Sequence, residues 1–241
     1  MILKRDVKGE RCMKKLVIIP AYNEKDSIVN TVKDIKDNAP GFDYIVVNDC
    51  STDNTYDVCV ENGLKVINLP LNLGIGGAVQ TGYLYAFQNG YDIAVQFDGD
   101  GQHDAAYLNE MADYLVKNEC DMVIGSRFIE KEGFQSSFIR RVGIKYFTFL
   151  IHLLTGKTIT DPTSGMRMCN RRTIEMFAKE YPIDYPEPES TVRLIRHKRK
   201  IEEVPVIMRE RAEGVSSLSS VRHSVYYMIK VSIAILVEKW R

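Results

Sequence analysis

The sequence predicts an α/β fold in which a mainly parallel, Rossmann-like sheet is covered by helices on both faces. Short apolar runs alternate with segments of helical length up to about residue 125. The runs are continuously apolar rather than alternating with polar residues, which is typical of parallel strands buried on both faces. With 241 residues, 45% of them hydrophobic, the chain is long enough to form one such domain.

Strands and helices are expected to alternate in this first half. The expected strands lie at residues 16–19, 44–47, 65–68, 93–97 and 121–124. The expected helices lie at 25–38, from about 53, at 76–89 and at 105–117. Val204–Met208 has the composition of one further strand. Glu187 and Glu189 favour a helix start, because acids suit the positive end of the helix dipole.

Two later segments, residues 138–154 and 221–240, are expected to form amphipathic helices. Both combine basic residues with aromatic and aliphatic ones, a pattern that suits the surface of an anionic membrane. Packing on the domain's own core or on a partner subunit explains the pattern equally well. The longest apolar run, Val231–Val237, is far shorter than the roughly 18 residues that a membrane span requires.

Composition excludes several classes of function. Lys plus Arg and Asp plus Glu number 32 each, so the charge balance gives no sign of nucleic-acid binding. The five cysteines are scattered, which indicates reduced thiols in a cytosolic protein. The charged start has no apolar signal-peptide core, so no secretory signal is expected. We expect an N-terminal extension at 1–13, one domain at 14–215 and a C-terminal associating helix at 216–241.

Polar side chains gather where three of the expected strands end. Glu24 follows the first strand, Asp49 the second, and Asp98 and Asp100 the fourth. In open parallel sheets ligands bind beyond the carboxyl ends of the strands, so these residues predict a site at that edge. Carboxylates two residues apart on extended backbone can share a divalent cation, and the glycines next to them, Gly99 and Gly101, leave room for a phosphate.

Each of these motifs also has a purely structural explanation. The Asp98–Gly101 segment is an ordinary turn composition after a strand. Ser51 or Thr52 can cap the next helix. The segment Asn72–Gly77 can cradle a phosphate at a helix N-terminus, or it can simply form a tight turn. It is not a Rossmann fingerprint, because no acid follows at the expected distance.

The order and spacing of these motifs resemble the family 2 glycosyltransferases with the GT-A fold. The matching segments are Val17–Glu24, Val46–Asp53, Asn72–Ala78 and Asp98–His103. Three further segments are similar to the polyprenyl-phosphate branch of that family, which includes dolichyl-phosphate mannose synthases: Gly125–Phe128, Asp161–Arg167 and Tyr185–Glu189. The resemblance covers most of residues 16–215 and identifies the 14–215 domain as a catalytic domain.

The resemblance implies a role for each motif in binding a nucleotide diphosphate sugar. The nucleotide-binding residues would be Pro20, Tyr22, Glu24, Asp49, Gly77 and Asp98. The metal ligands would be Asp98, Asp100 and Gln102, which hold Mg²⁺ or Mn²⁺. Hard oxygen ligands suit these ions, and such an ion neutralises charge that builds on the departing nucleotide diphosphate. Asp100, Arg127 and Asp161 would be the catalytic residues.

The resemblance also implies that the acceptor is a polyprenyl phosphate. A phosphate monoester has a second pKa of about 6, so near pH 7 it needs positioning more than deprotonation. Arginine is suited to bidentate phosphate contacts. The expected acceptor residues are Arg127, Arg140, Arg209, Arg211 and Glu189. Asp161 would act as a base, or it would orient the acceptor and stabilise the oxocarbenium-like sugar; a turn role is its structural alternative.

The expected activity is inverting transfer of a hexose or N-acetylhexosamine to undecaprenyl phosphate, for cell-wall or surface polysaccharide modification. A UDP sugar is preferred as the donor. We expect peripheral attachment to the cytoplasmic face of the membrane, with a small membrane protein as a partner and a homo-oligomer as an option. Two alternatives remain: a transferase with a saccharide hydroxyl acceptor, and a non-catalytic nucleotide-binding subunit of a membrane complex.

Overall fold

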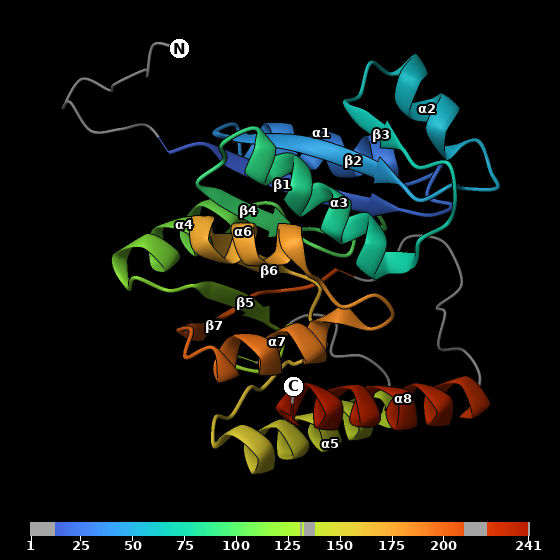
Figure 1. Ribbon diagram of the computed structural model, residues 1–241. Coiled ribbons are helices and arrows are strands. Elements are labelled where there is room, and N and C mark those ends of the chain that lie inside the picture. The colour runs from blue at the N-terminus through green and yellow to red at the C-terminus, as the bar shows by residue number, and fades with distance from the viewer. Residues whose placement is uncertain (1–12, 131, 133–137, 210–220, 241) are drawn as a thin grey trace.

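The computed structural model describes residues 13–130, 132, 138–209 and 221–240 (Figure 1). Its described part contains a seven-stranded sheet in the order β3-β2-β1-β4-β6-β5-β7. The strands are β1 (Lys15–Ala21), β2 (Phe42–Asn48), β3 (Val66–Asn68), β4 (Ile93–Gln96), β5 (Met122–Ser126), β6 (Arg167–Asn170) and β7 (Ile201–Pro205). All neighbouring pairs are parallel except those made by β6, which is antiparallel to both β4 and β5.

Helices cover both faces of this sheet, as the continuously apolar strands predicted. They are α1 (Ile28–Asn38), α2 (Thr55–Glu61), α3 (Gly74–Gln88), α4 (Tyr107–Lys117), α5 (Phe138–Thr155), α6 (Arg171–Lys179), α7 (Pro186–Arg196) and α8 (Val221–Trp240). Alternate residues of β1 point to opposite faces. Val17 and Ile19 pack in the core layer under α1 and α4, whereas Leu16 and Ile18 pack under α3 and α6.

The five strands and four helices expected in the first half are confirmed with small changes at their ends. Strand β6 was not predicted. Its four residues begin with Arg167 and carry no long apolar run, and they pair with β4 only because the chain returns from far along the sequence. The expected strand at 204–208 starts too late. The observed β7 begins at Ile201 and includes the half-buried Glu202 and Glu203.

Helix α3 lies unusually close to the sheet. A Cβ added to Gly82 would lie 2.1 Å from Ile18 Cγ2, so only glycine allows this approach. At the start of the same helix, a Cβ on Gly76 would lie 2.1 Å from the Pro182 carbonyl oxygen. The Gly76 amide donates to the Ile183 carbonyl at 3.0 Å. The glycine-rich segment therefore seats the 182–183 loop against α3.

Helix α8 packs on α7 and α5 beside the sheet (Figure 1). Val231 and Ile235 are buried in the same core as α3 and α6. Arg193 of α7 pairs with Glu238 of α8 at 2.9 Å, and both side chains are almost fully buried. The expected helices at 138–154 and 221–240 are confirmed, and α8 is anchored to the rest of the described domain by one face.

The opposite faces of α5 and α8 expose two rows of apolar side chains at helical spacing. On α5 they are Val142, Tyr146, Phe149 and Leu153; on α8 they are Tyr226, Ile229, Ile233 and Leu236. We call these eight residues the α5–α8 apolar face. Across the described ranges no helix is both long and apolar enough to cross a membrane.

Candidate active site

Loops from β1 and β4 meet at the predicted edge of the sheet. A Cβ placed on Gly99 would lie 3.2 Å from the Pro20 carbonyl oxygen and 3.6 Å from Glu24 Cγ. The Gly99 carbonyl accepts a hydrogen bond of 3.1 Å from Thr31 Oγ1 on α1. The segment after β4 is therefore packed directly on the segment after β1, as the shared strand-end position predicted.

Asn23 ties the β1 loop to the β2 loop. Its backbone is in the left-handed region, with φ 58°, which asparagine tolerates better than most residues. Its Oδ1 accepts from the backbone amides of Thr52 at 2.8 Å and Asp53 at 3.2 Å, and its own amide donates to Ser51 Oγ at 3.0 Å. The hydroxyls of Ser51 and Thr52 donate to Asn48 and Asn23, so neither caps α2, as the structural alternative for this segment would have had it. Asp53 Oδ1 accepts a hydrogen bond from the Thr55 amide at the start of that helix.

The predicted nucleotide-binding residues fall into two groups. Tyr22 is exposed and Glu24 is half-buried at this edge, where a ligand can reach them. Pro20 is buried within β1, and Asp49 is 4% exposed, with its Oδ1 accepting from the Leu73 amide at 2.7 Å. A Cβ on Gly77 would lie 2.4 Å from Leu73 Cβ, so packing alone accounts for this glycine. Their nucleotide contacts stay predictions.

His103 is a partner of the Asp98 carboxylate, a role that was not predicted from the sequence. Its Nε2 lies 3.0 Å from Asp98 Oδ2, while its ring stacks beside Phe97 with centroids 5.1 Å apart. Desolvation raises the pKa of Asp98, but His103 outweighs it, with help from Gln96, and holds the pKa below its usual range. The buried aromatic neighbour and the position directly after Gln102 were the only hints in the sequence.

The oxygen atoms around Asp98 and Asp100 fit a hard divalent cation. Both carboxylates follow β4, and Asp100 Oδ1 also accepts the Gln102 amide at 3.0 Å, which curls the loop back toward them. Carboxylate oxygens are hard ligands of the kind that Mg²⁺ and Mn²⁺ prefer. In the part of the chain that is described, no three His, Cys, Asp or Glu side chains gather around a single point. Any ion here would therefore be held by two carboxylates and keep positions for a phosphate.

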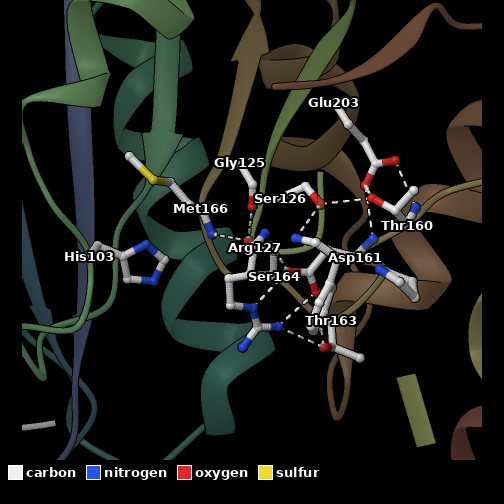
Figure 2. A network of polar contacts seen from close by, with 12 residues as sticks. His103, Gly125, Ser126, Arg127, Thr160, Asp161, Thr163, Ser164, Met166 and Glu203 are labelled. Carbon is white, nitrogen blue, oxygen red and sulfur yellow. Dashed lines mark hydrogen bonds and ion pairs between the residues drawn. The ribbon is translucent and has the colours of Figure 1, made fainter. Parts of the chain in front are cut away.

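Arg127 and Asp161 form a buried ion pair at the end of β5 (Figure 2). Arg127 Nε donates to Asp161 Oδ2 and Arg127 Nη2 to Asp161 Oδ1, both at 2.7 Å. The two side chains are 5% and 0% exposed. Because both carboxylate oxygens accept from one guanidinium, the pairing fixes the plane of Arg127. The structure thus brings these two predicted catalytic residues together.

Glu203 of β7 holds the turn that carries Asp161 (Figure 2). Its carboxylate accepts from the amides of Thr160 at 2.7 Å and Asp161 at 2.9 Å, and from Thr160 Oγ1 at 3.0 Å. Burial raises the pKa of Glu203, and these hydrogen bonds oppose the rise. This residue was not predicted, because Glu202 and Glu203 look like a solvated charged pair before an apolar run.

The loop after Asp161 also passes close to Asp98, one of the predicted metal acids. A Cβ on Gly165 would lie 2.6 Å from Asp98 Oδ2, so this glycine lets the loop pass close to the carboxylate. Ser164 Oγ donates to the Gly125 carbonyl at 2.6 Å and fastens the loop to β5. Asp98 and the Arg127–Asp161 pair are therefore parts of one site, although they are far apart in the sequence.

The other residues expected to bind the acceptor lie in different parts of the structure. Arg140 of α5 lies near the pair: desolvation lowers its pKa, the like charge of Arg127 lowers it further, and Asp161 and Asp98 oppose the change. Arg209 is held elsewhere, by Asp34 at 3.2 Å and Asp104 at 3.0 Å, so its expected role in binding the acceptor phosphate has no support. Arg211 lies outside the described residues.

Glu189 is also directed away from the predicted acceptor position. Its Oε1 lies 3.6 Å from Arg193 Nη2, on the side of α7 that faces α8. The same guanidinium binds Glu238 and Glu180, and it is 5% exposed. Sequence spacing alone could not show this, because successive residues of a helix point in different directions.

Two known sugar transferases are similar to this chain in sequence. The chain is 32% identical over 211 residues to UDP-N-acetylglucosamine–dolichyl-phosphate N-acetylglucosaminyltransferase of Methanococcus voltae, covering 79% of this chain and 83% of that protein. It is 31% identical over 216 residues to undecaprenyl-phosphate mannosyltransferase of Micrococcus luteus, covering 86% and 88%.

The fold is shared with a solved enzyme at lower sequence identity. Glucosyl-3-phosphoglycerate synthase from Mycobacterium tuberculosis, crystallised with Mn²⁺, UDP-glucose and phosphoglyceric acid, superposes with a TM-score of 0.71 at 17% identity. The superposition covers 94% of this chain and 80% of that one, and it shows a GT-A fold. The profile of Glycosyl transferase family 2 matches residues 16–177. With that match, and with relatives that transfer sugars to polyprenyl and dolichyl phosphates, the chain belongs to the family 2 glycosyltransferases and is a glycosyltransferase enzyme.

Proposed function

We propose that this enzyme transfers a hexose or N-acetylhexosamine from a UDP sugar to a polyprenyl phosphate, with inversion at the anomeric carbon. Two similar proteins carry polyprenyl-type phosphates in their names, and one of them also carries UDP-N-acetylglucosamine. The donor would lie at the strand-end edge with its diphosphate beside Asp98 and Asp100. The acceptor phosphate would lie beside Arg127 and Arg140.

The observation that carries the proposal is the position of the Arg127–Asp161 pair: the loop after Asp161 passes the predicted metal acid Asp98, where a Cβ on Gly165 would lie 2.6 Å from Asp98 Oδ2. Arg140 of α5 adds a second cation: burial lowers its pKa, and repulsion by the like charge of Arg127 lowers it further. Asp161 neutralises Arg127 through both of its oxygens. A phosphate dianion between the two arginines would relieve that repulsion, and arginine is suited to binding it by two hydrogen bonds.

A phosphate acceptor also removes the need for a general base. Near pH 7 the monoester is already largely ionised, so the enzyme has to orient it rather than deprotonate it. Asp161 is engaged by Arg127 on both oxygens and would act by aligning that guanidinium. When bound, Mg²⁺ or Mn²⁺ would supply Lewis-acid neutralisation of the diphosphate leaving group. Asp98, Asp100 and Gln102 would hold the ion.

The α5–α8 apolar face would place this site at the cytoplasmic surface of the membrane. Helix α5 carries both Arg140 and the exposed Phe149 and Leu153, so a lipid phosphate could be held while its chain stays in the bilayer. Exposed apolar residues flanked by basic ones are typical of helices that lie in a membrane interface. A small membrane protein or a second copy of the chain is the alternative occupant of this face.

A transfer assay tests the proposed function. The enzyme is incubated with Mn²⁺, undecaprenyl phosphate in detergent, and radiolabelled UDP-glucose, UDP-N-acetylglucosamine or GDP-mannose. We expect label in an organic-extractable product that mild acid releases. Arg140→Ala should raise the acceptor KM at least ~10-fold, because one charge-assisted contact is lost. Arg141→Ala, one position along α5, should leave it nearly unchanged. Label in saccharide alone would instead indicate a hydroxyl acceptor.

A flotation assay tests the membrane face. The intact chain is mixed with protein-free vesicles that contain phosphatidylglycerol. The double variant Phe149→Ser, Leu153→Ser should lower the bound fraction at least ~10-fold, because two large apolar side chains leave the interface. The double variant Val60→Ser, Val116→Ser changes exposed apolar residues on α2 and α4 and should bind normally. Binding to native membranes but never to protein-free vesicles would point to a protein partner.

A further inference from the structure

The two acids of the Pro186–Glu189 sequence have different surroundings. Both lie in the first turn of α7. Glu189 pairs with Arg193, which is also bound to α8 through Glu238. Glu187 instead reaches the end of β4, where its Oε1 accepts from Gln96 Nε2 at 3.4 Å. Only Glu187 therefore belongs to the same strand end as Asp98.

The Gln96 amide holds Glu187 and Asp98 side by side. Gln96 is fully buried, and its Oε1 accepts from the Tyr181 hydroxyl at 3.4 Å. The other end of the amide, Nε2, is therefore the donor, and it donates a hydrogen bond to the Glu187 carboxylate. The side chain of Gln96 also hydrogen bonds to the Asp98 carboxylate. One immobile amide thus directs two carboxylates toward the same part of the site.

A second anchor fixes the main chain of Glu187. Arg167 Nη1 donates to the Glu187 carbonyl at 2.6 Å and to Thr191 Oγ1 at 2.8 Å, so the first turn of α7 cannot shift. Burial raises the pKa of Glu187, Arg167 opposes the rise, and the negative charge of Asp98 adds to it. Among the described residues, no Lys, Arg or His forms an ion pair with this carboxylate.

The Glu187 carboxylate accepts from Gln96 Nε2, and its two oxygens can accept a further hydrogen bond from a ligand. A shared cation is disfavoured, because Glu187 does not complete any three-acid metal cluster within the described ranges. The transferred sugar has to lie between the diphosphate near Asp98 and the acceptor near Arg127. Its hydroxyl groups are strong donors to a carboxylate, and such charge-assisted hydrogen bonds discriminate well between ligands.

We propose that Glu187 accepts a hydrogen bond from a hydroxyl group of the donor sugar and helps to select which sugar is transferred. The inference rests on the proposed function, because it assumes a nucleotide sugar at this edge. It gives Glu187 a donor-sugar contact, whereas the family resemblance singled out Glu189 and placed it among the acceptor residues.

Calorimetric binding of nucleotide sugars, without turnover, tests this assignment. UDP-glucose, UDP-N-acetylglucosamine and GDP-mannose are titrated into the wild type with Mn²⁺, each beside its nucleotide diphosphate alone. In Glu187→Gln, the sugar preferred by the wild type should bind at least ~10-fold more weakly, while the nucleotide alone and Mn²⁺ bind within about twofold of wild type. Glu189→Gln should leave the difference between sugar and nucleotide affinity intact.

The possible outcomes separate the two proposals. If no nucleotide sugar binds the wild type, the proposed function is wrong and this inference is overturned with it. Suppose instead that the wild type binds a nucleotide sugar more tightly than the nucleotide diphosphate alone. If Glu187→Gln keeps that same difference in affinity, only this inference is overturned. Weaker Mn²⁺ binding in Glu187→Gln would show a metal ligand instead and would also overturn it. Should Glu187→Gln melt at a lower temperature, Glu187→Asp keeps the charge, and its sugar contribution is expected to fall in the same way.

Discussion

Replacing Asp100 with Asn should lower the transfer rate at least ~10³-fold while the protein stays folded. Asn keeps a carbonyl oxygen that can still accept the Gln102 amide, now seen at 3.0 Å, so the turn after β4 has no reason to open. What would be lost is the negative charge that we propose faces the diphosphate and its cation. Label incorporated into undecaprenyl phosphate per minute measures the effect. Wild-type activity should also vanish with excess EDTA and return with Mn²⁺.

The control for this variant is the same substitution on the exposed surface of the neighbouring helix. Asp113→Asn on α4 removes one charge at an exposed position and should transfer sugar at the wild-type rate. Thermal melting of both variants shows whether a loss of transfer activity comes from a change at the site or from unfolding of the protein. Near-normal transfer by a folded Asp100→Asn protein would refute the assignment of Asp100 to the cation and leaving group.

Replacing Arg167 with Met should destabilise the fold by about 3–5 kcal/mol, because it leaves buried acceptors without their donor. Arg167 is 1% exposed and joins the loop after Asp161 to the start of α7. Its five acceptors are the carbonyls of Pro162, Ser164 and Glu187 and the hydroxyls of Ser190 and Thr191. Met fills a similar volume, so the loss reflects hydrogen bonds rather than a cavity. Urea unfolding followed by circular dichroism measures the change.

Arg172→Met is the matched control, because Arg172 is an exposed residue in the first turn of α6. It should change the free energy of unfolding by no more than about 0.5 kcal/mol. Arg167→Lys should recover only part of the loss, because a single ammonium cannot reach acceptors on both segments as a planar guanidinium does. A loss below about 1 kcal/mol in Arg167→Met would mean that other donors or water satisfy these carbonyls.

Arg167 also shows what a sequence motif leaves open. It ends a segment similar to the polyprenyl-phosphate branch, and that segment does not show whether the cation meets a ligand or the protein itself. In the structure its guanidinium donates hydrogen bonds to backbone and hydroxyl oxygens inside the protein. Arg209, at the surface, was expected to bind a phosphate, but it forms ion pairs with Asp34 and Asp104. Whether an arginine meets a ligand or its own protein depends on neighbours that are distant in the chain.

The sequence by itself determined the α/β fold, the continuous apolar strands and the edge at which the acids gather. These features depend on short-range patterns, namely apolar runs of strand length and the polar residues that follow them. Only the tertiary structure decided the pairing of Arg127 with Asp161, the support of that turn by Glu203, and the different partners of Glu187 and Glu189. Each of these depends on contacts between residues tens of positions apart, made when β6 enters the sheet antiparallel between β4 and β5. The direction of a side chain and its partners depend on that packing. Residue spacing along the chain does not show them.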